Sequence, residues 1–203
     1  AKVKKAVILS VGRCTEKEVV SSIKILNKYL KDNFVILNCL SAYPAPFNEF
    51  SFQRTLRLKN DFKVLTGLSD HSNSTDAALI TLALGGLVFE KHIMLEENTD
   101  TSLDKDFSST ELEFKNYIDT IKSAYVGLSS GKFEIMNSET VNSHLKRSIY
   151  ATKDIQAGEV FTKENTKSVR PGNGLHPHRY KELLGSISTR KIEANNPIKD
   201  TDF

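Results

Sequence analysis

The sequence predicts an α/β protein in which alternating strands and helices build a parallel sheet, followed by a small β-rich domain. Short apolar runs typical of buried parallel strands recur along residues 1–129, and helical patterns separate them. A polar stretch then leads into short β-type runs and glycine-rich turns. Right-handed crossovers would place the carboxyl ends of all the parallel strands, and hence a ligand site, at one edge of the sheet.

Each strand of the first domain is predicted to be followed by a helix. The predicted strands cover residues 6–11, 34–39, 64–68 and 86–92. The first predicted helix begins near Thr15. Three further helices are predicted at residues 49–58, 75–84 and 111–128. The clearest start is at Thr15, which forms a capping-box pattern with Glu18 ahead of an apolar stripe at helical spacing.

Residues 130–145 are predicted to be a linker, and residues 146–203 a separate small domain. This domain contains a turn at 171–174 and a brief helix at 177–184 that stops at Gly185. Residues 153–165 weakly resemble residues 190–202, and each copy has an isoleucine, a turn and an apolar strand. Two such copies predict a pseudo-symmetric β domain.

The composition excludes several classes of protein. The 28 basic and 25 acidic residues are spread along the chain, so neither a nucleic-acid partner nor a membrane partner is expected. The two cysteines, Cys14 and Cys39, are not in CxxC spacing, which indicates a cytoplasmic protein without a disulfide framework. The first residues enter a strand almost at once and lack a signal-peptide pattern, so we expect an excised fragment.

Two histidines and a carboxylate are predicted to meet where two adjacent strands end. Residues two apart on a strand face the same side, so Ser69 shares a face with His71, and Glu90 shares a face with His92. Imidazoles and a carboxylate at the mouth of a barrel are typical of a divalent metal site. The charged triplet Glu90-Lys91-His92 is also difficult to place in a core, because buried charge is costly unless it is paired or metal-bound. The remaining histidines are interpreted as structural: His144, His176 and His178.

Two further strand ends are weaker signals. Ser41 and Tyr43 have the same parity at the start of a loop that begins Tyr43-Pro44. Ser10 precedes Gly12, whose missing side chain would let backbone amides approach an anion. Taken by itself, each of these two segments is typical of an ordinary turn.

The order of the strand-end motifs is far more specific than any one of them. The chain reads SVG, CLSAYPAP, GLSDHS, FEKHI and SLDKDFS, followed by RSIYATKDIQAGE and VRPGNGL. This series resembles the N-acetylneuraminate (sialic acid) synthase family and its relatives that make other nonulosonic acids. The resemblance implies the carboxyl-terminal half of a TIM-type (β/α)8 barrel, its last four β/α units, followed by a SAF (antifreeze-like, β-clip) domain. It also implies condensation of phosphoenolpyruvate with an N-acetylmannosamine-like sugar, with release of phosphate.

The resemblance implies roles for particular residues. His71 and His92 would hold a divalent ion, Mn²⁺ by preference with Mg²⁺ or Co²⁺ as alternatives, and would form the catalytic group together with Glu90. Arg170 would reach from the SAF domain into the site of a partner subunit, as in a homodimer, and contact the N-acyl group of the sugar. The other substrate-binding residues would be Ser10, Ser41, Tyr43, Ser69, Asp70, Lys91 and Asp104. Of these, Ser10 and Ser69 would contact the phosphate, and Asp104 would contact the sugar beside Glu90.

Departures from the usual family pattern leave the sugar open. The chain has Val11-Gly12-Arg13 where relatives often have threonine followed by glycine and methionine, Ser41 in place of a polar amide, and Lys105 in the acidic loop. The family's first four strands are absent from the chain, so we expect it to be incomplete as an enzyme by itself. Two alternatives remain: a non-catalytic carbohydrate-binding fragment, and another metal-dependent barrel aldolase or lyase.

Overall fold

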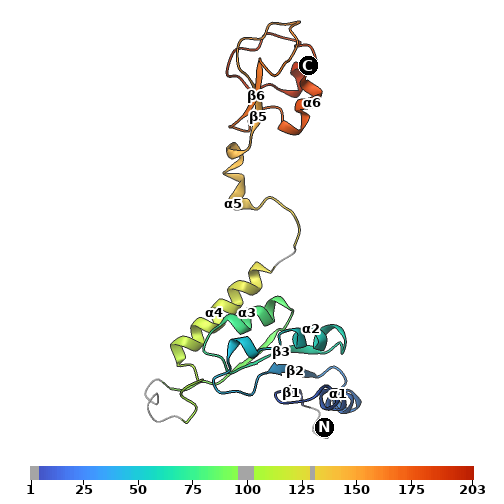
Figure 1. Cartoon of the computed structure of the whole chain (residues 1–203), viewed down its shortest axis with the longest axis vertical. Helices are drawn as coiled ribbons and strands as arrows, with labels where there is room; N and C mark the ends of the chain where they lie inside the picture. The colour runs from blue at the N-terminus through green and yellow to red at the C-terminus, as the bar shows by residue number, and fades with distance from the viewer. Residues whose placement is uncertain (1–4, 96–102, 129–130) are drawn as a thin grey trace. The chain divides into compact units, whose positions relative to one another are not determined.

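The computed structural model of the chain describes residues 5–95, 103–128 and 131–203. The chain divides into two compact units, Ala1–Gly131 and Lys132–Phe203, and Figure 1 labels the elements of both. The division falls inside the segment predicted as a linker, residues 130–145, the first of which lies outside the described residues. Each unit has its own buried hydrophobic cluster.

The first unit contains a four-stranded parallel sheet in the order β1-β2-β3-β4. Its strands are β1 (Val7–Ser10), β2 (Phe34–Cys39), β3 (Leu65–Asp70) and β4 (Val88–Lys91). Each strand lies in a segment that the apolar runs predicted, and β3 continues two residues further than expected. Gly67 of β3 lies so close to β4 that an added Cβ would collide with the Val88 carbonyl.

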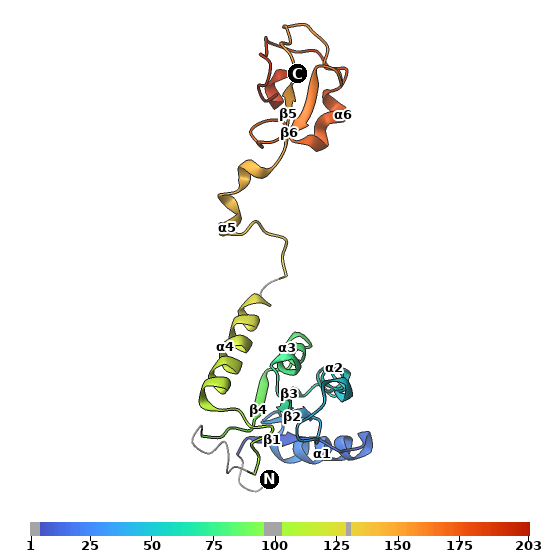
Figure 2. The same cartoon turned by 60° about the vertical axis from the view of Figure 1, so that its left-hand side comes forward.

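Helices follow the strands as predicted. They are α1 (Glu16–Leu30), α2 (Gln53–Asn60), α3 (Asp76–Ala83) and α4 (Glu111–Gly127), and α3 and α4 lie side by side (Figure 2). The Thr15 capping box is confirmed, because the Thr15 amide donates to Glu18 Oε2 at 2.7 Å.

The predicted start of α2 was wrong. A short 3₁₀ turn, η1 (Phe47–Glu49), precedes it, and α2 begins only at Gln53. The rings of Phe50 and Phe52 stack with centroids 5.1 Å apart, and Phe47 packs 5.6 Å from Phe52. The segment before α2 is therefore an aromatic cluster and not the first turn of a helix.

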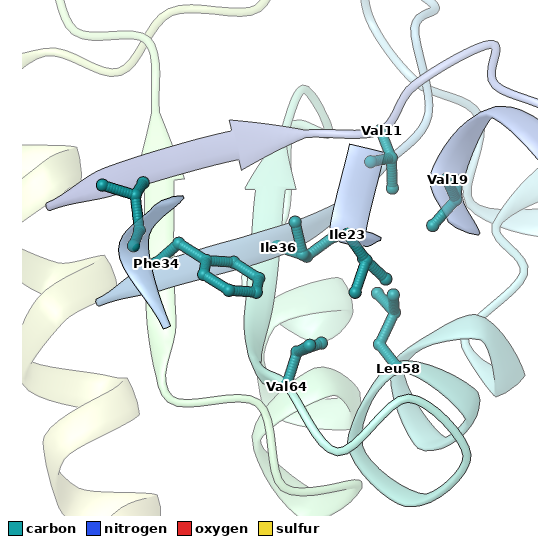
Figure 3. Close-up of a cluster of buried hydrophobic side chains, with 8 residues drawn as sticks. Val11, Val19, Ile23, Phe34, Ile36, Leu58 and Val64 are labelled. Atoms are coloured by element: carbon teal, nitrogen blue, oxygen red, sulfur yellow. The ribbon is translucent and has the colours of Figure 1, made fainter. Parts of the chain in front are cut away.

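Strand alternation gives the sheet two different faces. One face carries Val11, Ile36 and Leu68, which are buried against the helices, and Figure 3 shows Val11 and Ile36 with the side chains of α1 and α2 that pack on them. The opposite face carries Ile8 and Leu65, whose exposed fractions are 58% and 47%. A curled parallel sheet with helices on one face, and with an inner face that is exposed at Ile8 and Leu65, is the half-barrel that the sequence predicted.

The second unit is a small β domain. It contains one antiparallel pair, β5 (Ser148–Ala151) with β6 (Thr166–Val169). Its helical segments are α5 (Asn137–Thr140), η3 (Ser143–Leu145), η4 (Pro177–Arg179), α6 (Tyr180–Leu183) and η5 (Asp200–Asp202). Its core residues are Ile149, Ala151, Ile155, Phe161, Leu175, Leu183, Ile192 and Ile198.

The internal duplication is visible in the pairing of this domain. Ile155 and Ile192, the isoleucines of the two similar segments, form an antiparallel bridge with both backbone hydrogen bonds at 2.8 Å. The brief helix predicted near 177–184 corresponds to η4 and α6, and Gly185 follows with φ of 90°. The two similar segments therefore pair with each other at one equivalent position.

Among the described residues, no helix is long and apolar enough to cross a bilayer.

Candidate active site

Three side chains from three strands meet on the inner face of the sheet. Ser69 Oγ on β3 donates to Glu90 Oε1 on β4 at 2.7 Å, and Ser10 Oγ on β1 donates to the same oxygen at 3.3 Å. Glu90 is exposed on this open face. The structure thus brings Ser10, Ser69 and Glu90 together, as strand parity predicted for Ser69 and Glu90.

His71 and His92 follow β3 and β4, and their rings lie on the same side. The ring centroids are 5.3 Å apart. With a metal–nitrogen distance of about 2.1 Å, two imidazole rings that share one ion have centres about 5 Å apart. The separation of the two rings therefore fits joint coordination of one divalent ion.

The second nitrogen of each ring is held by a group that can only accept a hydrogen bond. His71 Nδ1 lies 2.9 Å from the Leu40 carbonyl oxygen, and His92 Nδ1 lies 3.3 Å from Asp104 Oδ2. These contacts engage Nδ1 of each ring, so Nε2 is the ring nitrogen that remains for another partner. Such partners orient metal-binding histidines. Within residues 5–95, 103–128 and 131–203, no cluster of three or more His, Cys, Asp or Glu side chains could hold an ion.

Aromatic rings surround the two histidines. The Tyr43 ring lies 4.3 Å from His71 and 6.2 Å from His92, measured between centroids. Phe107 lies 4.9 Å from both Tyr43 and His92. Tyr43 was predicted to line the site, whereas Phe107 was missed although it belongs to the loop that carries Asp104. The aromatic rings of Tyr43 and Phe107 therefore form an apolar surface next to the two imidazoles.

Cys39 is the second residue that the sequence interpretation missed. It is the register partner of Ser69 and is buried. Burial alone would raise the pKa of the Cys39 thiol, but hydrogen bonds with His71 and Ser41 outweigh burial and lower it. The pKa of His71 is raised, first by the Cys39 thiol and against the effect of burial. Strand parity could have identified Cys39, because it lies two residues before Ser41.

Gly12 leaves the space that these side chains occupy. A Cβ at this position would collide with the Ser41 hydroxyl and crowd the Cys39 sulfur. The Cys39 sulfur itself lies 3.8 Å from Ser41 Oγ. Gly12 is therefore required for the packing of the β2 end of the site, a role different from the anion contact that the sequence suggested.

Asp70 and Lys91, predicted to bind substrate, do not lie on the face that carries Ser69 and Glu90. They alternate with Ser69, His71, Glu90 and His92, so they face the helices. Asp70 is fully buried, and the Lys91 side chain is 5% exposed with Nζ 3.9 Å from Asp70 Oδ2. A polar cleft of about 510 Å³ opens on this outer side, and its lining includes Lys91 but not His71 or Glu90.

Arg170 belongs to the second unit and follows β6. It is exposed, and within the part of the chain that the structure describes it makes no ion pair. His176 and His178, interpreted as structural, contact each other, with their Nδ1 atoms 2.7 Å apart. His144 Nδ1 contacts the Val141 carbonyl at 3.2 Å.

The chain is similar in sequence to named synthases. The chain is 39% identical over 203 residues to a pseudaminic acid synthase of Campylobacter jejuni, which covers 100% of the chain and 59% of the relative. It is 34% identical over 203 residues to an N,N'-diacetyllegionaminic acid synthase of the same species, which covers 98% of the chain and 60% of the relative. The chain therefore spans about three fifths of the length of these curated relatives.

The fold is also similar to that of a solved structure. The N-acetylneuraminic acid (sialic acid) synthetase from Leptospira borgpetersenii, crystallised with citrate, matches with a TM-score of 0.61 and 27% identity, over 70% of this chain and 49% of that one. Residues 146–203 match the SAF domain. Residues 1–133, which contain both histidines and Glu90, match the NeuB family model, and the chain belongs to the NeuB family.

Proposed function

We propose that the chain is the carboxyl-terminal part of a synthase that condenses phosphoenolpyruvate with an N-acylated amino sugar and releases phosphate. The observation that carries this proposal is the placement of His71, His92 and Glu90 at one edge of the half-barrel. The names of the NeuB-family relatives support the same reaction class.

In the proposed reaction, the enol carbon of phosphoenolpyruvate forms a bond to the aldehyde carbon of the open-chain sugar. Water adds to the resulting cation at the phosphate-bearing carbon, phosphate leaves, and a 2-keto sugar acid remains. A divalent ion, with Mn²⁺ preferred, supplies Lewis-acid polarisation of the aldehyde oxygen when it is bound. His71 and His92 are the residues that would hold it.

Glu90 and the two serines would act on the substrates. Ser10 and Ser69 now donate to Glu90, and a phosphate that accepted those hydroxyls would lie next to the carboxylate. A carboxylate at this position could exchange a proton with the sugar or with the attacking water. Ser41, Tyr43 and Asp104 would line the sugar pocket, with Asp104 also orienting His92.

The product is proposed to be an acid of the pseudaminic or legionaminic kind. The support is the 39% and 34% identity to synthases with those names. We further propose a cytoplasmic homodimer in which Arg170 of one subunit contacts the N-acyl group of the sugar in the other. Its exposure and its lack of an ion pair among the described residues are consistent with this role.

The test is an assay of the chain, expressed with any coding sequence that adjoins it, for phosphate release from phosphoenolpyruvate. N-acetylmannosamine and the diacetylated amino sugars that correspond to the two product types would be compared, each with Mn²⁺ and with chelator. Metal-dependent release with one of these sugars would support the proposal. Sugar binding without release would support the carbohydrate-binding alternative, and cleavage of a preformed keto acid alone would support a lyase.

A further inference from the structure

A buried ionic cluster lies directly behind the two histidines. Asp70 Oδ1 accepts hydrogen bonds from the Ser72 amide at 2.9 Å and the Ser72 hydroxyl at 2.7 Å. Asp70 Oδ2 accepts from the Tyr117 hydroxyl of α4 at 3.1 Å and faces Lys91 Nζ at 3.9 Å. Lys91 Nζ in turn donates to the Ser72 carbonyl at 2.6 Å and lies 5.4 Å from the centre of the Tyr117 ring.

The cluster holds the backbone on both sides of His71. Asp70 and Ser72 are its two chain neighbours, and they are joined to each other through the Asp70 carboxylate. Lys91, the neighbour of His92, is bound to the same pair. A shift of this cluster would therefore move the histidine at the end of β3 relative to the histidine that follows β4.

The cluster is a costly way to stabilise a fold. Asp70 is fully buried and the Lys91 side chain is 5% exposed, and buried ion pairs are often no more stabilising than apolar residues of the same volume. Burial lowers the pKa of Lys91 and raises the pKa of Tyr117, and the Asp70 carboxylate opposes the first shift and adds to the second. If these three residues served only to fill the core, apolar side chains could take the place of the Lys91 ammonium, the Asp70 carboxylate and the Tyr117 phenol.

We propose that Asp70, Lys91 and Tyr117 are positioning residues that set the separation and orientation of His71 and His92 from the outer side of the sheet. The proposal rests on the proposed function, since it takes the two histidines as the ligands of one divalent ion. Asp70 and Lys91 belong to strands, and Tyr117 connects them to a helix, because its hydroxyl on α4 donates to Asp70.

The decisive variant is Tyr117→Phe, which removes only the hydroxyl that donates to Asp70 and keeps the ring. The matched control is Tyr125→Phe, the same change on the same helix at a side chain that is 60% exposed. Asp70→Asn is a second test that keeps the shape and an acceptor for Ser72 but removes the charge that faces Lys91. All three are made in the chain expressed with any adjoining coding sequence.

Two measurements are made on each variant. Mn²⁺ affinity, read from the electron paramagnetic resonance signal of the free ion, should weaken about 10-fold in Tyr117→Phe, the size typical of partners that orient metal ligands. Without metal, amide hydrogen exchange at residues 70–72 and 91–92 should accelerate while exchange in α1 is unchanged. Tyr125→Phe should match the parent protein in both measurements.

The outcomes separate the two proposals. Unchanged exchange at residues 70–72 in both Tyr117→Phe and Asp70→Asn would overturn the positioning role, as would acceleration that extends equally to α1, because that pattern describes a general loss of stability. If the parent protein binds no Mn²⁺, the metal assignment in the proposed function fails. The exchange experiment then decides alone whether the cluster holds the two histidine segments in place.

Discussion

Ser10 Oγ donates a hydrogen bond to Glu90 Oε1 at 3.3 Å, although β2 and β3 lie between their strands. In a flat sheet, strands three positions apart are separated by about 14 Å. The two side chains can meet only because the sheet is curled around its inner face. The geometry of the candidate site is therefore a direct consequence of sheet curvature.

The first prediction concerns Glu90. Glu90→Gln keeps an oxygen that can accept from Ser10 and Ser69 but removes the group that exchanges protons. We expect a loss of turnover of at least about 100-fold, the lower range for a general acid or base, with an unchanged unfolding temperature. Glu49→Gln, at an exposed position in η1, is the control. Full activity in Glu90→Gln would show that Glu90 only orients its neighbours.

The second prediction concerns the histidines. His71→Ala or His92→Ala should lower Mn²⁺ affinity by more than about 100-fold, beyond the effect typical of outer partners. His144→Ala, in the second unit, should leave the affinity unchanged. Isothermal titration of metal-stripped protein measures all three. Equal affinity in the parent protein and in both histidine variants would place any ion elsewhere.

The third prediction separates sugar binding from phosphoenolpyruvate binding. Arg170→Ala should raise the KM for the sugar about 10- to 100-fold, as expected when a charged hydrogen-bond donor is lost, and should leave the KM for phosphoenolpyruvate nearly unchanged. Lys167→Ala removes a neighbouring exposed cation of β6 and is the control. Equal effects on both substrates, with the fold intact, would indicate a structural role for Arg170.

The fourth prediction concerns the stability of the second unit. Arg190 donates from Nε to Asp202 Oδ1 at 2.7 Å and from a terminal nitrogen to Oδ2 at 3.1 Å, and Asp202 is fully buried. Arg190→Ala leaves that carboxylate without its counter-ion, so we expect a clear loss of stability of the second unit. Lys191→Ala breaks only an exposed contact to Asp154 and should cost at most about 1 kcal/mol.

The protection of the Ile149 amide against hydrogen exchange reports this stability, because Ile149 is buried and its amide donates to the Leu175 carbonyl at 2.9 Å. Similar protection in the two variants would mean that the backbone amide of Lys199, which also donates to Asp202 at 2.8 Å, is sufficient to hold the carboxylate.

The fifth prediction concerns the 203 residues expressed alone. β1 and β4 are the outer strands of the described sheet, and Ile8 on the inner face is 58% exposed. Open edges and uncovered apolar faces favour pairing with other chains. We expect self-association in light scattering and negligible synthase turnover. A stable monomer with robust turnover would contradict this prediction.

Local patterns predicted the parts of the fold that depend on neighbouring residues. Thr15 and Glu18 cap α1 as expected because a capping box involves only the first turn of a helix. The start of α2 was predicted incorrectly because the packing of Phe47 and Phe50 against Phe52 overrides helical periodicity. The isoleucines at equivalent positions of the two similar segments pair with each other.

Strand alternation predicts which face of the sheet each candidate site residue occupies, and that part of the site could be predicted from the sequence. The faces of Ser69, Glu90 and the two histidines followed from alternation, and the same rule would have placed Asp70 and Lys91 on the opposite face. What no local rule supplies is the partner of Asp70, since Tyr117 lies on a helix far along the chain. The contact depends on the packing of α4 over β3, which is a property of the assembled unit.

The order of the sheet also bears on how the unit forms during synthesis. Every strand of the sheet pairs only with strands adjacent to it in the chain. The strands can therefore pair one after another, β1 to β4, in the order in which they are synthesised. Asp70 and Lys91 emerge before α4, and until α4 has been released Tyr117 cannot cover them. The charged pair behind the two histidines is therefore enclosed only after α4 has been synthesised.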